Sequence, residues 1–209
     1  MNVLVVGAGG IGCPALVVLG AAGCDVTIAD GDFVELSNLN RQILHRTADV
    51  GRPKVDSARD ALHRRFPALD VETVFGRIDE SYDVAPFDVV LDGSDSFATK
   101  LALSDACVRA GVRLVHGGCI GWRGQLMTVT RESACVRCLF EDVPAEQPSC
   151  QEAGILGAVA GVTGARMAEE ALRPQLVGKL RSFDFLSGED RIIDVRRRKS
   201  CDAHARGAA

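Results

Sequence analysis

Short apolar runs alternate with longer segments of helical character along most of the chain. Each run is rich in valine, isoleucine or leucine and is bounded by glycine, proline or charged residues, which is typical of buried strands. We therefore predict strands at residues 2–6, 25–29, 71–75, 87–92, 113–116, 124–130, 180–185 and 191–195. The segments between them predict helices at residues 11–22, 53–66, 97–110 and 152–172.

This order of elements predicts a single α/β domain with a doubly wound, Rossmann-like and mostly parallel sheet. Residues 124–130 alternate between apolar and polar side chains, so we expect an antiparallel strand there and an antiparallel addition at one end of the sheet. Residues 33–46 are polar and are expected to form a loop with a short helical turn across the carboxyl end of the sheet. Residues 131–151 are expected to form a long irregular segment.

The opening of the chain combines the features of a nucleotide-binding unit. The first strand runs into Gly7-Ala-Gly-Gly-Ile-Gly12, a helix follows, and Asp30 stands at the carboxyl end of the next strand. The glycines let backbone N–H groups approach phosphates, the helix N-terminus adds positive charge, and the acid can accept hydrogen bonds from ribose hydroxyls. A glycine turn that only packs a helix on a sheet is the simpler alternative. The pattern indicates a nucleotide site and leaves NAD, FAD and ATP open.

Composition excludes several classes of protein. The chain has 209 residues, of which 47% are hydrophobic, enough for one well-buried domain. The net charge is −4, so no nucleic-acid surface is expected, and the basic residues 196–199 are interpreted as solvated. With neither a membrane-length apolar run nor a recognisable signal peptide, we expect a cytoplasmic protein without membrane association. The eight cysteines are then interpreted as metal ligands, nucleophiles or core residues rather than disulfides.

Further motifs follow the glycine turn in a fixed order. They are D-x-D at 30–32, S-N-L-x-R-Q at 37–42, G-x-P-K-V at 51–55, L-D-G-S-D at 91–95, Gly-Gly at 117–118, Gly-Gln at 124–125, C-x-x-C at 135–138 and C-x-E-A-G at 150–154. With these motifs the sequence resembles the ThiF/MoeB/HesA family, the prokaryotic relatives of ubiquitin-activating enzymes. The resemblance extends from about residue 3 to residue 204, nearly the whole chain.

The resemblance implies an adenylyltransferase that uses ATP and Mg²⁺. Its substrate would be the C-terminal Gly-Gly carboxylate of a ubiquitin-like sulfur carrier protein of the ThiS/MoaD type, and pyrophosphate would be released. It also implies a homodimer and one adenylation domain, with nucleotide binding within about residues 1–118 and carrier and zinc binding within about 119–209. Thiamine, molybdopterin, cysteine and a secondary metabolite all stay open as destinations of the sulfur. The implied nucleotide-site residues are Gly7, Gly9, Gly10, Gly12, Asp30, Asp32, Asn38, Arg41, Gln42, Lys54 and Asp95.

The charged residues in this set suit that chemistry. An α-carboxyl group has a pKa of about 3.5, so the nucleophile is already ionised and needs no general base. The obstacle is an anion approaching a polyphosphate, which cations and positioning overcome. We assign Arg41 and Lys54 as these cations and Asp95 as the magnesium ligand. Each residue alone has a simpler explanation, a solvated cation or a helix cap, but together at the family's spacing they favour a catalytic function.

Two pairs of residues with metal-binding side chains have matching spacing. Cys135 and Cys138 form the first pair, and Cys201 and His204 form the second. One such pair could be a redox pair or chance, but two can form a tetrahedral zinc site that ties the C-terminal tail to the segment after the sheet. Family members with this site use two C-x-x-C pairs, so His204 stands in place of a cysteine. We predict a structural zinc site, because four protein ligands leave no open position for catalysis.

Cys150 is the third candidate for chemistry. It stands just before the helix predicted from residue 152, a position that lowers the pKa of a thiol. In several family members the matching cysteine takes part in thioester, acyl-disulfide or persulfide chemistry during sulfur transfer, whereas others do not need it. We therefore treat Cys150 as a candidate catalytic residue, with a semi-buried loop cysteine as the alternative. The remaining cysteines are expected to be small core residues: Cys13, Cys24, Cys107 and Cys119.

The sequence departs from the family pattern in several places. Family members usually carry a helix before the first strand, with an arginine that reaches the ATP of the other subunit. No such helix is recognised in this sequence, so we expect that the arginine is dispensable here, that another residue replaces it, or that the activity is weak. The family's Asp-Asn is Asp95-Ser96 here, and its later arginine is Lys100. Because no rhodanese domain is recognised, the sulfur is expected to come from a separate donor protein.

Two other functions stay open at this point. An NAD-dependent oxidoreductase is permitted by the opening unit alone, but it predicts a hydride-transfer residue and a substrate domain that are not recognisable. A non-catalytic relative that holds a ubiquitin-like partner is favoured by the missing arginine and opposed by Arg41, Lys54 and Asp95. Within the family, a tRNA-modifying dehydratase or a peptide-adenylating enzyme is a further possibility, and the lack of basic surface weighs against tRNA.

Overall fold

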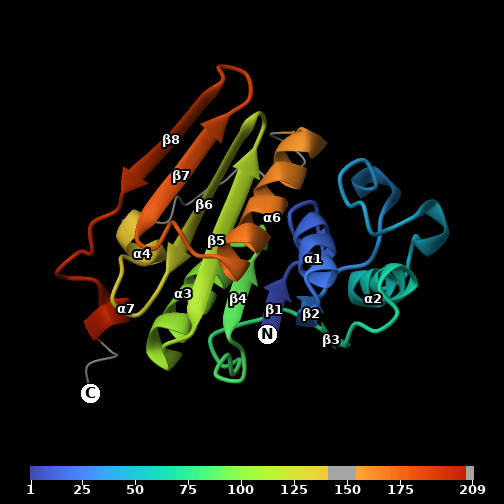
Figure 1. The fold of residues 1–209 in the computed structure, drawn as a ribbon, viewed down its shortest axis with the longest axis horizontal. Coiled ribbons are helices and arrows are strands. Elements are labelled where there is room, and N and C mark those ends of the chain that lie inside the picture. Colours follow the sequence, from blue (N-terminus) through green and yellow to red (C-terminus); the bar gives the residue numbers. More distant parts are fainter. Residues whose placement is uncertain (141–153, 206–209) are drawn as a thin grey trace.

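The computed structural model describes residues 1–140 and 154–205. Its strands form an eight-stranded sheet in the order β3-β2-β1-β4-β5-β6-β7-β8 (Figure 1). The strands are β1 (Asn2–Val6), β2 (Asp25–Asp30), β3 (Val71–Phe75), β4 (Val89–Asp92), β5 (Arg113–Ile120), β6 (Arg123–Val129), β7 (Lys179–Asp184) and β8 (Glu189–Asp194). The first five strands pair in parallel and the last three continue the sheet antiparallel, which confirms the predicted fold class.

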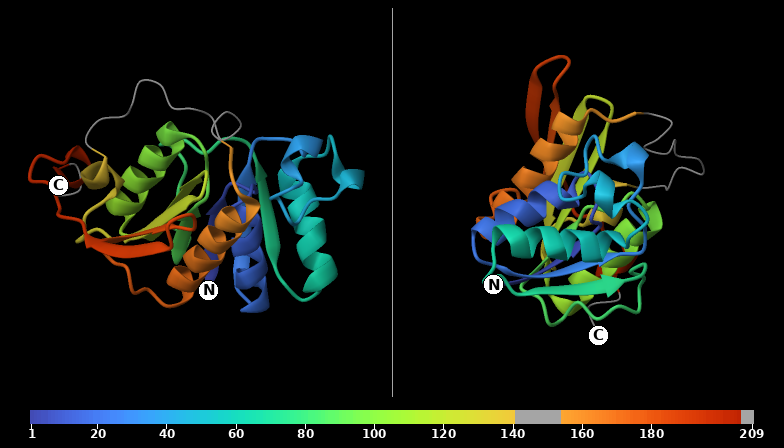
Figure 2. Two further views of the ribbon diagram at one scale, coloured as in Figure 1. Left: turned by 90° about the horizontal axis from the view of Figure 1, so that it is seen from above. Right: turned by 90° about the vertical axis from the view of Figure 1, so that its right-hand side faces the viewer.

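Helices cover both faces of the sheet (Figure 2). One face carries α1 (Gly12–Ala21), α2 (Lys54–Arg65) and α6 (Gly157–Leu172), and the other carries α3 (Phe97–Ala110), α4 (Val136–Leu139) and α7 (Asp202–Ala205). Successive side chains of a strand point to opposite faces, so Val3 and Val5 join the first core and Leu4 and Val6 join the second. Among the helices of residues 1–140 and 154–205, none is both long enough and apolar enough to cross a membrane.

The strand order creates a switch point beside β1. The chain passes from β1 to its neighbour β2 and then to β3, and it returns to the opposite side of β1 as β4. The loops that follow β1 and β4 therefore diverge at the carboxyl end of the sheet. In doubly wound sheets such a point leaves a crevice in which ligands bind. The glycine turn and residues 93–96 follow strands at this edge, and Asp30 is the last residue of β2 there.

The bounds of the observed elements differ from the predicted ones mainly where pairing with a distant segment determines where an element begins or ends. β5 continues to Ile120 instead of ending at 116, because residues 117–120 pair with β6. The segment 131–151 contains the short helix α4, and α6 begins at Gly157 rather than at 152. The expected helical turn in the loop after β2 is η1 (Leu36–Asn38), and a second turn, η2 (Thr47–Asp49), lies just beyond that loop.

The contact between α6 and α1 is unusually close at Gly164. A Cβ atom at this position would lie 2.0 Å from the carbonyl oxygen of Ile11, so only glycine fits without movement of the backbone. A Cβ atom on Gly161, one turn earlier, would meet no described heavy atom within 4 Å other than those of its own helix backbone and chain neighbours. The same contact places Ala160 against the glycine turn: the Cβ atom of Ala160 lies 3.3 Å from where a Cβ on Gly10 would stand. Packing of α6 thus supports the turn from behind.

The two glycines of α6 provide a matched test of this packing. Gly164→Ala should lower the free energy of unfolding by about 1–3 kcal/mol, because the added methyl group meets backbone atoms. Gly161→Ala should instead raise it by about 0.5–1 kcal/mol, because alanine is the better helix former and has room. Urea denaturation of both variants measures the signs, and a change of the same sign in both would contradict this explanation of the contact.

Candidate functional site

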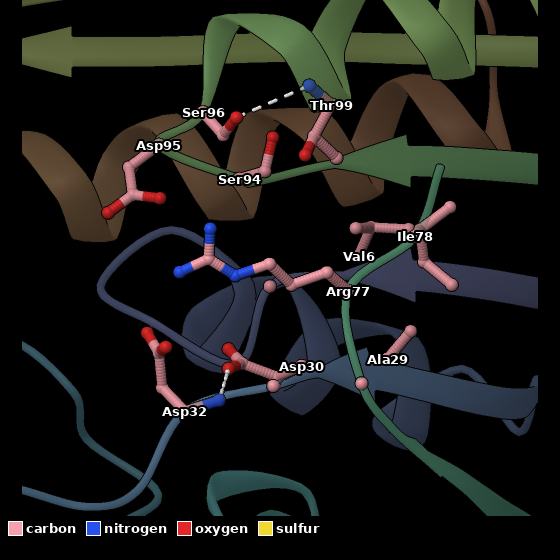
Figure 3. A pocket seen from close by; sticks show the side chains of 13 residues that line it. Val6, Ala29, Asp30, Asp32, Arg77, Ile78, Ser94, Asp95, Ser96 and Thr99 are labelled. Atoms are coloured by element: carbon pink, nitrogen blue, oxygen red, sulfur yellow. Dashed lines mark hydrogen bonds between the residues drawn. The ribbon is translucent and has the colours of Figure 1, made fainter. Parts of the chain in front are cut away.

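A pocket of about 140 Å³ opens where the first four strands end (Figure 3). Its apolar side is formed by Val6, Ala29 and Ile78. Four of the predicted nucleotide-site residues line it directly, and the side chains of the three acids are drawn in Figure 3: Gly7, Asp30, Asp32 and Asp95. The polar lining is completed mainly by Arg77, Ser94, Ser96 and Thr99. The pocket therefore has one apolar side and one acidic side.

Hydrogen bonds from backbone N–H groups hold the Asp30 side chain beside the glycine turn. Gly7 has a φ of 94°, in the left-handed region, and a Cβ on Gly12 would lie 1.7 Å from the Gly7 carbonyl oxygen. The carboxylate of Asp30 accepts from the N–H of Ala8 at 2.7 Å and from the N–H of Asp32 at 2.8 Å. Each carboxylate oxygen retains a further acceptor position, so Asp30 can still accept from a ligand hydroxyl.

Lys54 supplies a buried cation at the start of α2. Its ammonium nitrogen lies 2.9 Å from a carboxylate oxygen of Asp32. Burial acts to lower the pKa of Lys54, but the carboxylates of Asp30, Asp32 and Asp95 outweigh that effect, so the pKa is raised. Burial also raises the pKa of Asp30, and Lys54 and the two backbone N–H donors offset only part of this rise. Lys54 is thus held protonated beside the pocket by the acids that surround it.

Arg41 and Gln42 lie against the glycine turn, beside the pocket rather than in its lining. The Cγ of Arg41 is 3.1 Å from where a Cβ on Gly10 would stand, and the amide nitrogen of Gln42 is 3.8 Å from the same position on Gly9. Asn38 accepts a hydrogen bond from the Arg41 guanidinium at 2.8 Å, which fixes its orientation. The amide oxygen of Gln42 is buried and has no hydrogen-bond partner among the described residues, so one acceptor of the site is left unsatisfied there.

Asp95 and Ser96 lie between β4 and α3. The hydroxyl of Ser96 accepts a hydrogen bond from the N–H of Thr99 at 3.3 Å and caps α3. Serine is one of the preferred N-cap residues, so the departure from Asp-Asn to Asp95-Ser96 keeps the cap. The Asp95 side chain contributes to the pocket, as Figure 3 shows.

A buried charge network lies under this loop. Asp92, at the end of β4, is fully buried and accepts hydrogen bonds from the hydroxyl of Ser94 at 2.6 Å and from its N–H at 3.1 Å. His116 Nδ1 lies 2.9 Å from the same carboxylate, and the Lys100 ammonium lies 3.3 Å from it and donates to the Gly117 carbonyl at 2.9 Å. Burial raises the pKa of Asp92, but Lys100 and His116 outweigh it and lower that pKa to about 2. The ionised carboxylate therefore anchors the serine that lines the pocket.

Arg77 and this network are not among the residues predicted from the sequence. Arg77 comes two residues after the strand at 71–75, on the edge where the pocket forms, so a charged residue just past a strand end is the signal that could have found it. Lys100 is recognisable only as a replacement of the family's arginine. Its burial against Asp92 and the carbonyl of Gly117 depends on how α3 packs on the sheet, and spacing alone cannot show it.

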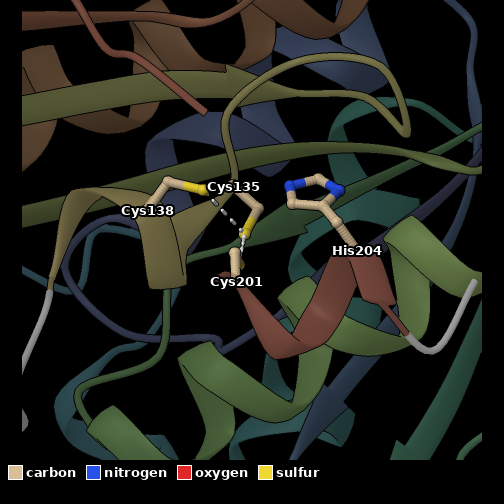
Figure 4. A group of neighbouring side chains, drawn as sticks. All are labelled: Cys135, Cys138, Cys201 and His204. Carbon is tan, nitrogen blue, oxygen red and sulfur yellow. Dashed lines mark hydrogen bonds between the residues drawn. The ribbon is translucent and has the colours of Figure 1, made fainter. Parts of the chain in front are cut away.

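The predicted metal ligands come together between α4 and α7 (Figure 4). The ligand atoms of Cys135, Cys138, Cys201 and His204 all lie within 4.8 Å of one another. The sulfur of Cys135 is 3.8 Å from that of Cys138 and 3.5 Å from that of Cys201. Both ring nitrogens of His204 are buried without a hydrogen-bond partner among the described residues, which a metal bond to one of them would explain. The donor set fits a four-coordinate zinc ion.

The other cysteines divide into two groups. Cys13, Cys24 and Cys107 are buried and Cys119 packs against the core, which confirms their predicted role as core residues. Burial raises the pKa of the Cys13 and Cys107 thiols to about 12, so neither is a nucleophile at neutral pH. Cys150 lies outside the described residues.

Comparisons with known proteins agree with this arrangement. Residues 1–203 match the ThiF family. The chain is 37% identical over 218 residues to the SAMP-activating enzyme E1 of Haloferax volcanii, covering 99% of this chain and 81% of that protein. It is also 37% identical over 211 residues to the sulfur carrier protein ThiS adenylyltransferase of Escherichia coli, covering 96% and 84%. The crystal structure of E. coli MccB with MccA-N7isoASN shares the fold, with a TM-score of 0.87 at 21% identity over 97% of this chain and 67% of that one.

The Asp92 network predicts a pH-dependent effect on stability. Because the pKa of Asp92 is lowered in the folded protein, its contribution is present above about pH 4 and is lost as the pH falls toward 2. Asp92→Asn should therefore lower the free energy of unfolding by about 3 kcal/mol or more at pH 7, because Lys100 loses its buried partner. Near pH 2.5 the same substitution should lower it by much less. Thermal unfolding against pH, with the exposed Asp70→Asn as control, measures the difference. An equal loss at every pH would contradict the assignment.

Proposed function

The chain belongs to the ThiF family and is an adenylyltransferase, and we propose that it adenylates the C-terminal Gly-Gly carboxylate of a ubiquitin-like sulfur carrier protein with ATP and Mg²⁺. The proposed carrier is of the ThiS/MoaD type. The observation that carries this proposal is the meeting of the glycine turn, Asp30, Lys54 and Asp95 at one edge of the sheet. Such an edge can hold a nucleotide and has a cation beside the acids.

Each part of this edge has a proposed task. The backbone N–H groups of the glycine turn and the N-terminus of α1 would bind phosphate, and the Asp30 carboxylate would accept from ribose hydroxyls. Lys54 and Arg41 would offset phosphate charge, as Asn38 orients Arg41. Gln42 would help to position the ribose or the phosphates. Its amide oxygen, which has no partner among residues 1–140 and 154–205, can accept from a ribose hydroxyl, and its amide N–H groups can donate to phosphate oxygens.

The chemical step needs positioning and charge rather than proton transfer. An oxygen of the ionised carrier carboxylate attacks the α-phosphorus, the α–β phosphoanhydride bond breaks, and pyrophosphate leaves with the bonding electron pair. Lys54 and Arg41 would offset the negative charge that builds up on the phosphate oxygens. Mg²⁺, when bound, would neutralise phosphate charge, and the Asp95 carboxylate offers the oxygen ligands that this ion prefers.

We extend the proposal to the organisation of the chain. Residues 1–118 would bind the nucleotide, and residues 119–209 would bind the carrier and zinc. The enzyme would act in the cytoplasm and, as the family resemblance suggests, as a homodimer, and a separate protein would donate the sulfur. Cys150 remains a candidate for the later sulfur-transfer chemistry.

We further propose that Cys135, Cys138, Cys201 and His204 hold a structural zinc ion. The support is the convergence of their ligand atoms and the two unpartnered ring nitrogens of His204 within the described part of the chain. A metal here would join α7 to α4. With four protein ligands it would have no open position and no part in catalysis.

The alternatives have less support. An NAD-dependent oxidoreductase rested on the opening unit alone, whereas the similar proteins are named as activating enzymes or adenylyltransferases of carrier proteins. A non-catalytic binding protein would not need Lys54 held protonated among Asp30, Asp32 and Asp95. Exchange of labelled pyrophosphate into ATP separates the two classes, because only a catalytic protein reverses the adenylation step.

Asp95→Ala tests the proposed reaction. Carrier-dependent ATP–pyrophosphate exchange should fall by about two orders of magnitude or more, because the magnesium ion that neutralises the phosphate charge would lose its protein ligand. Thermal stability should stay near that of the wild type. Asp70→Ala, an exposed acid before β3, is the matched control and should retain exchange. Exchange at the wild-type rate in Asp95→Ala would remove Asp95 from the site. If the wild-type protein shows no ATP–pyrophosphate exchange with any carrier that binds to it, the non-catalytic alternative would be favoured.

Cys201→Ser tests the metal site. The variant should lose bound zinc and unfold at a lower temperature, because one of four ligands is gone and α7 is released. Metal content by atomic emission and thermal unfolding are measured together. Cys24→Ser, a buried cysteine outside the cluster, should keep its zinc even if it loses some stability. Unchanged metal content in Cys201→Ser would refute the zinc site.

A further inference from the structure

Arg77 extends into the nucleotide pocket from the segment that follows β3, whereas the glycine turn borders the pocket at the end of β1. It follows β3, and the Cγ atom of its side chain lies 3.3 Å from where a Cβ on Gly31 would stand, so the stem passes close to the backbone of that residue. In Figure 3 the guanidinium group points between Asp95 on one side and Asp30 and Asp32 on the other. The side chain is solvent-exposed, so it can change its conformation.

The charge of Arg77 is not committed to another protein group. Among residues 1–140 and 154–205 it forms no hydrogen bond or ion pair within bonding distance, whereas Lys54 is already paired with Asp32 at 2.9 Å. The described lining of the pocket contains three carboxylates, and Arg77 is its one cationic side chain. A polyphosphate that enters beside three carboxylates is repelled unless a cation compensates. Arg77 is placed to provide that compensation.

We propose that Arg77 is a phosphate-binding residue of this pocket, a third cation in addition to Arg41 and Lys54. The inference rests on the proposed function and adds a residue that the family motifs do not mark. A guanidinium group has a planar set of N–H donors that can bind two phosphate oxygens at once. Arg77 would bind the phosphate chain from the β3 side while the glycine turn binds it from the β1 side.

The position of the guanidinium favours the phosphates over the base. The acid at the end of β2, Asp30, marks the ribose position, and the apolar Ile78 and Ala29 offer the surface for the base. In Figure 3 the stem of Arg77 starts beside these apolar residues, and its charged end reaches past them toward Asp95. The charged end is therefore near the expected phosphates, and only the stem is near the base.

Calorimetric titration of the whole 209-residue chain with ATP–Mg²⁺, AMP and adenosine tests this assignment. Arg77→Met should weaken ATP and AMP binding about tenfold and leave adenosine binding within about twofold, because only the first two carry phosphate. Arg77→Lys should recover part of the loss, since lysine keeps the charge but not the planar donors. Arg64→Met, an exposed arginine on α2, is the matched control and should bind all three ligands like the wild type.

Each other outcome overturns the assignment. Unchanged ATP binding in Arg77→Met, with normal binding by the wild type, would overturn the role of Arg77 and leave the proposed function standing. An equal loss for adenosine would place the contact on the nucleoside and refute phosphate binding. A wild-type protein that does not bind ATP–Mg²⁺ would overturn both the inference and the proposed function. Thermal unfolding of every variant shows whether a lost affinity reflects a lost fold.

Discussion

The close backbone approach inside the glycine turn is the constraint on which the site depends. A side chain on Gly12 would collide with the carbonyl of Gly7, so the turn between β1 and α1 can close only with glycine there. The turn directs the N-terminus of α1 toward the carboxyl end of the sheet, and the hydrogen bond from the N–H of Ala8 fixes Asp30 beside it. On the far side, α6 approaches α1 through Gly164 and supports the same turn. The backbones of β1, α1 and α6 thus set the position of the pocket.

Charge is organised around this backbone in two layers. The outer layer lies at the pocket, where Asp32 holds Lys54 and where Asp95 and Arg77 reach the lining. The inner layer is the buried network of Asp92, which anchors the loop that carries Asp95. Under the proposed function this arrangement suits the chemistry, because a carboxylate nucleophile is already ionised and the enzyme has to bring two anions together. The cluster of three cysteines and His204 lies apart from this edge, between α4 and α7, and the zinc ion proposed for it would be structural.

Local motifs allow much of this to be predicted from the sequence. The strand, glycine turn, helix and acid of the opening unit are contiguous. The Cys–Cys pair and the Cys–His pair each have the two-residue gap that brings side chains together at a short helix. The fold class and both residue sets can therefore be predicted. What depends on packing between distant segments cannot. The extension of β5 to Ile120 requires its pairing with β6, and the contact of Lys100 with Asp92 requires α3 to pack on the sheet. Arg77 belongs to no motif, and only the assembled sheet edge brings it to the pocket.

The most direct test of the proposed activity is the fate of the carrier itself. The wild-type protein is incubated with ATP–Mg²⁺ and a purified Gly-Gly-ending carrier, and the intact mass of the carrier is measured with rapid acid quenching. We expect a carrier heavier by one adenylyl group, formed together with pyrophosphate, and no such product when the terminal glycine is removed. A carrier of unchanged mass, in a mixture where the protein binds both ATP and carrier, would contradict the claim that this pocket activates a carboxylate.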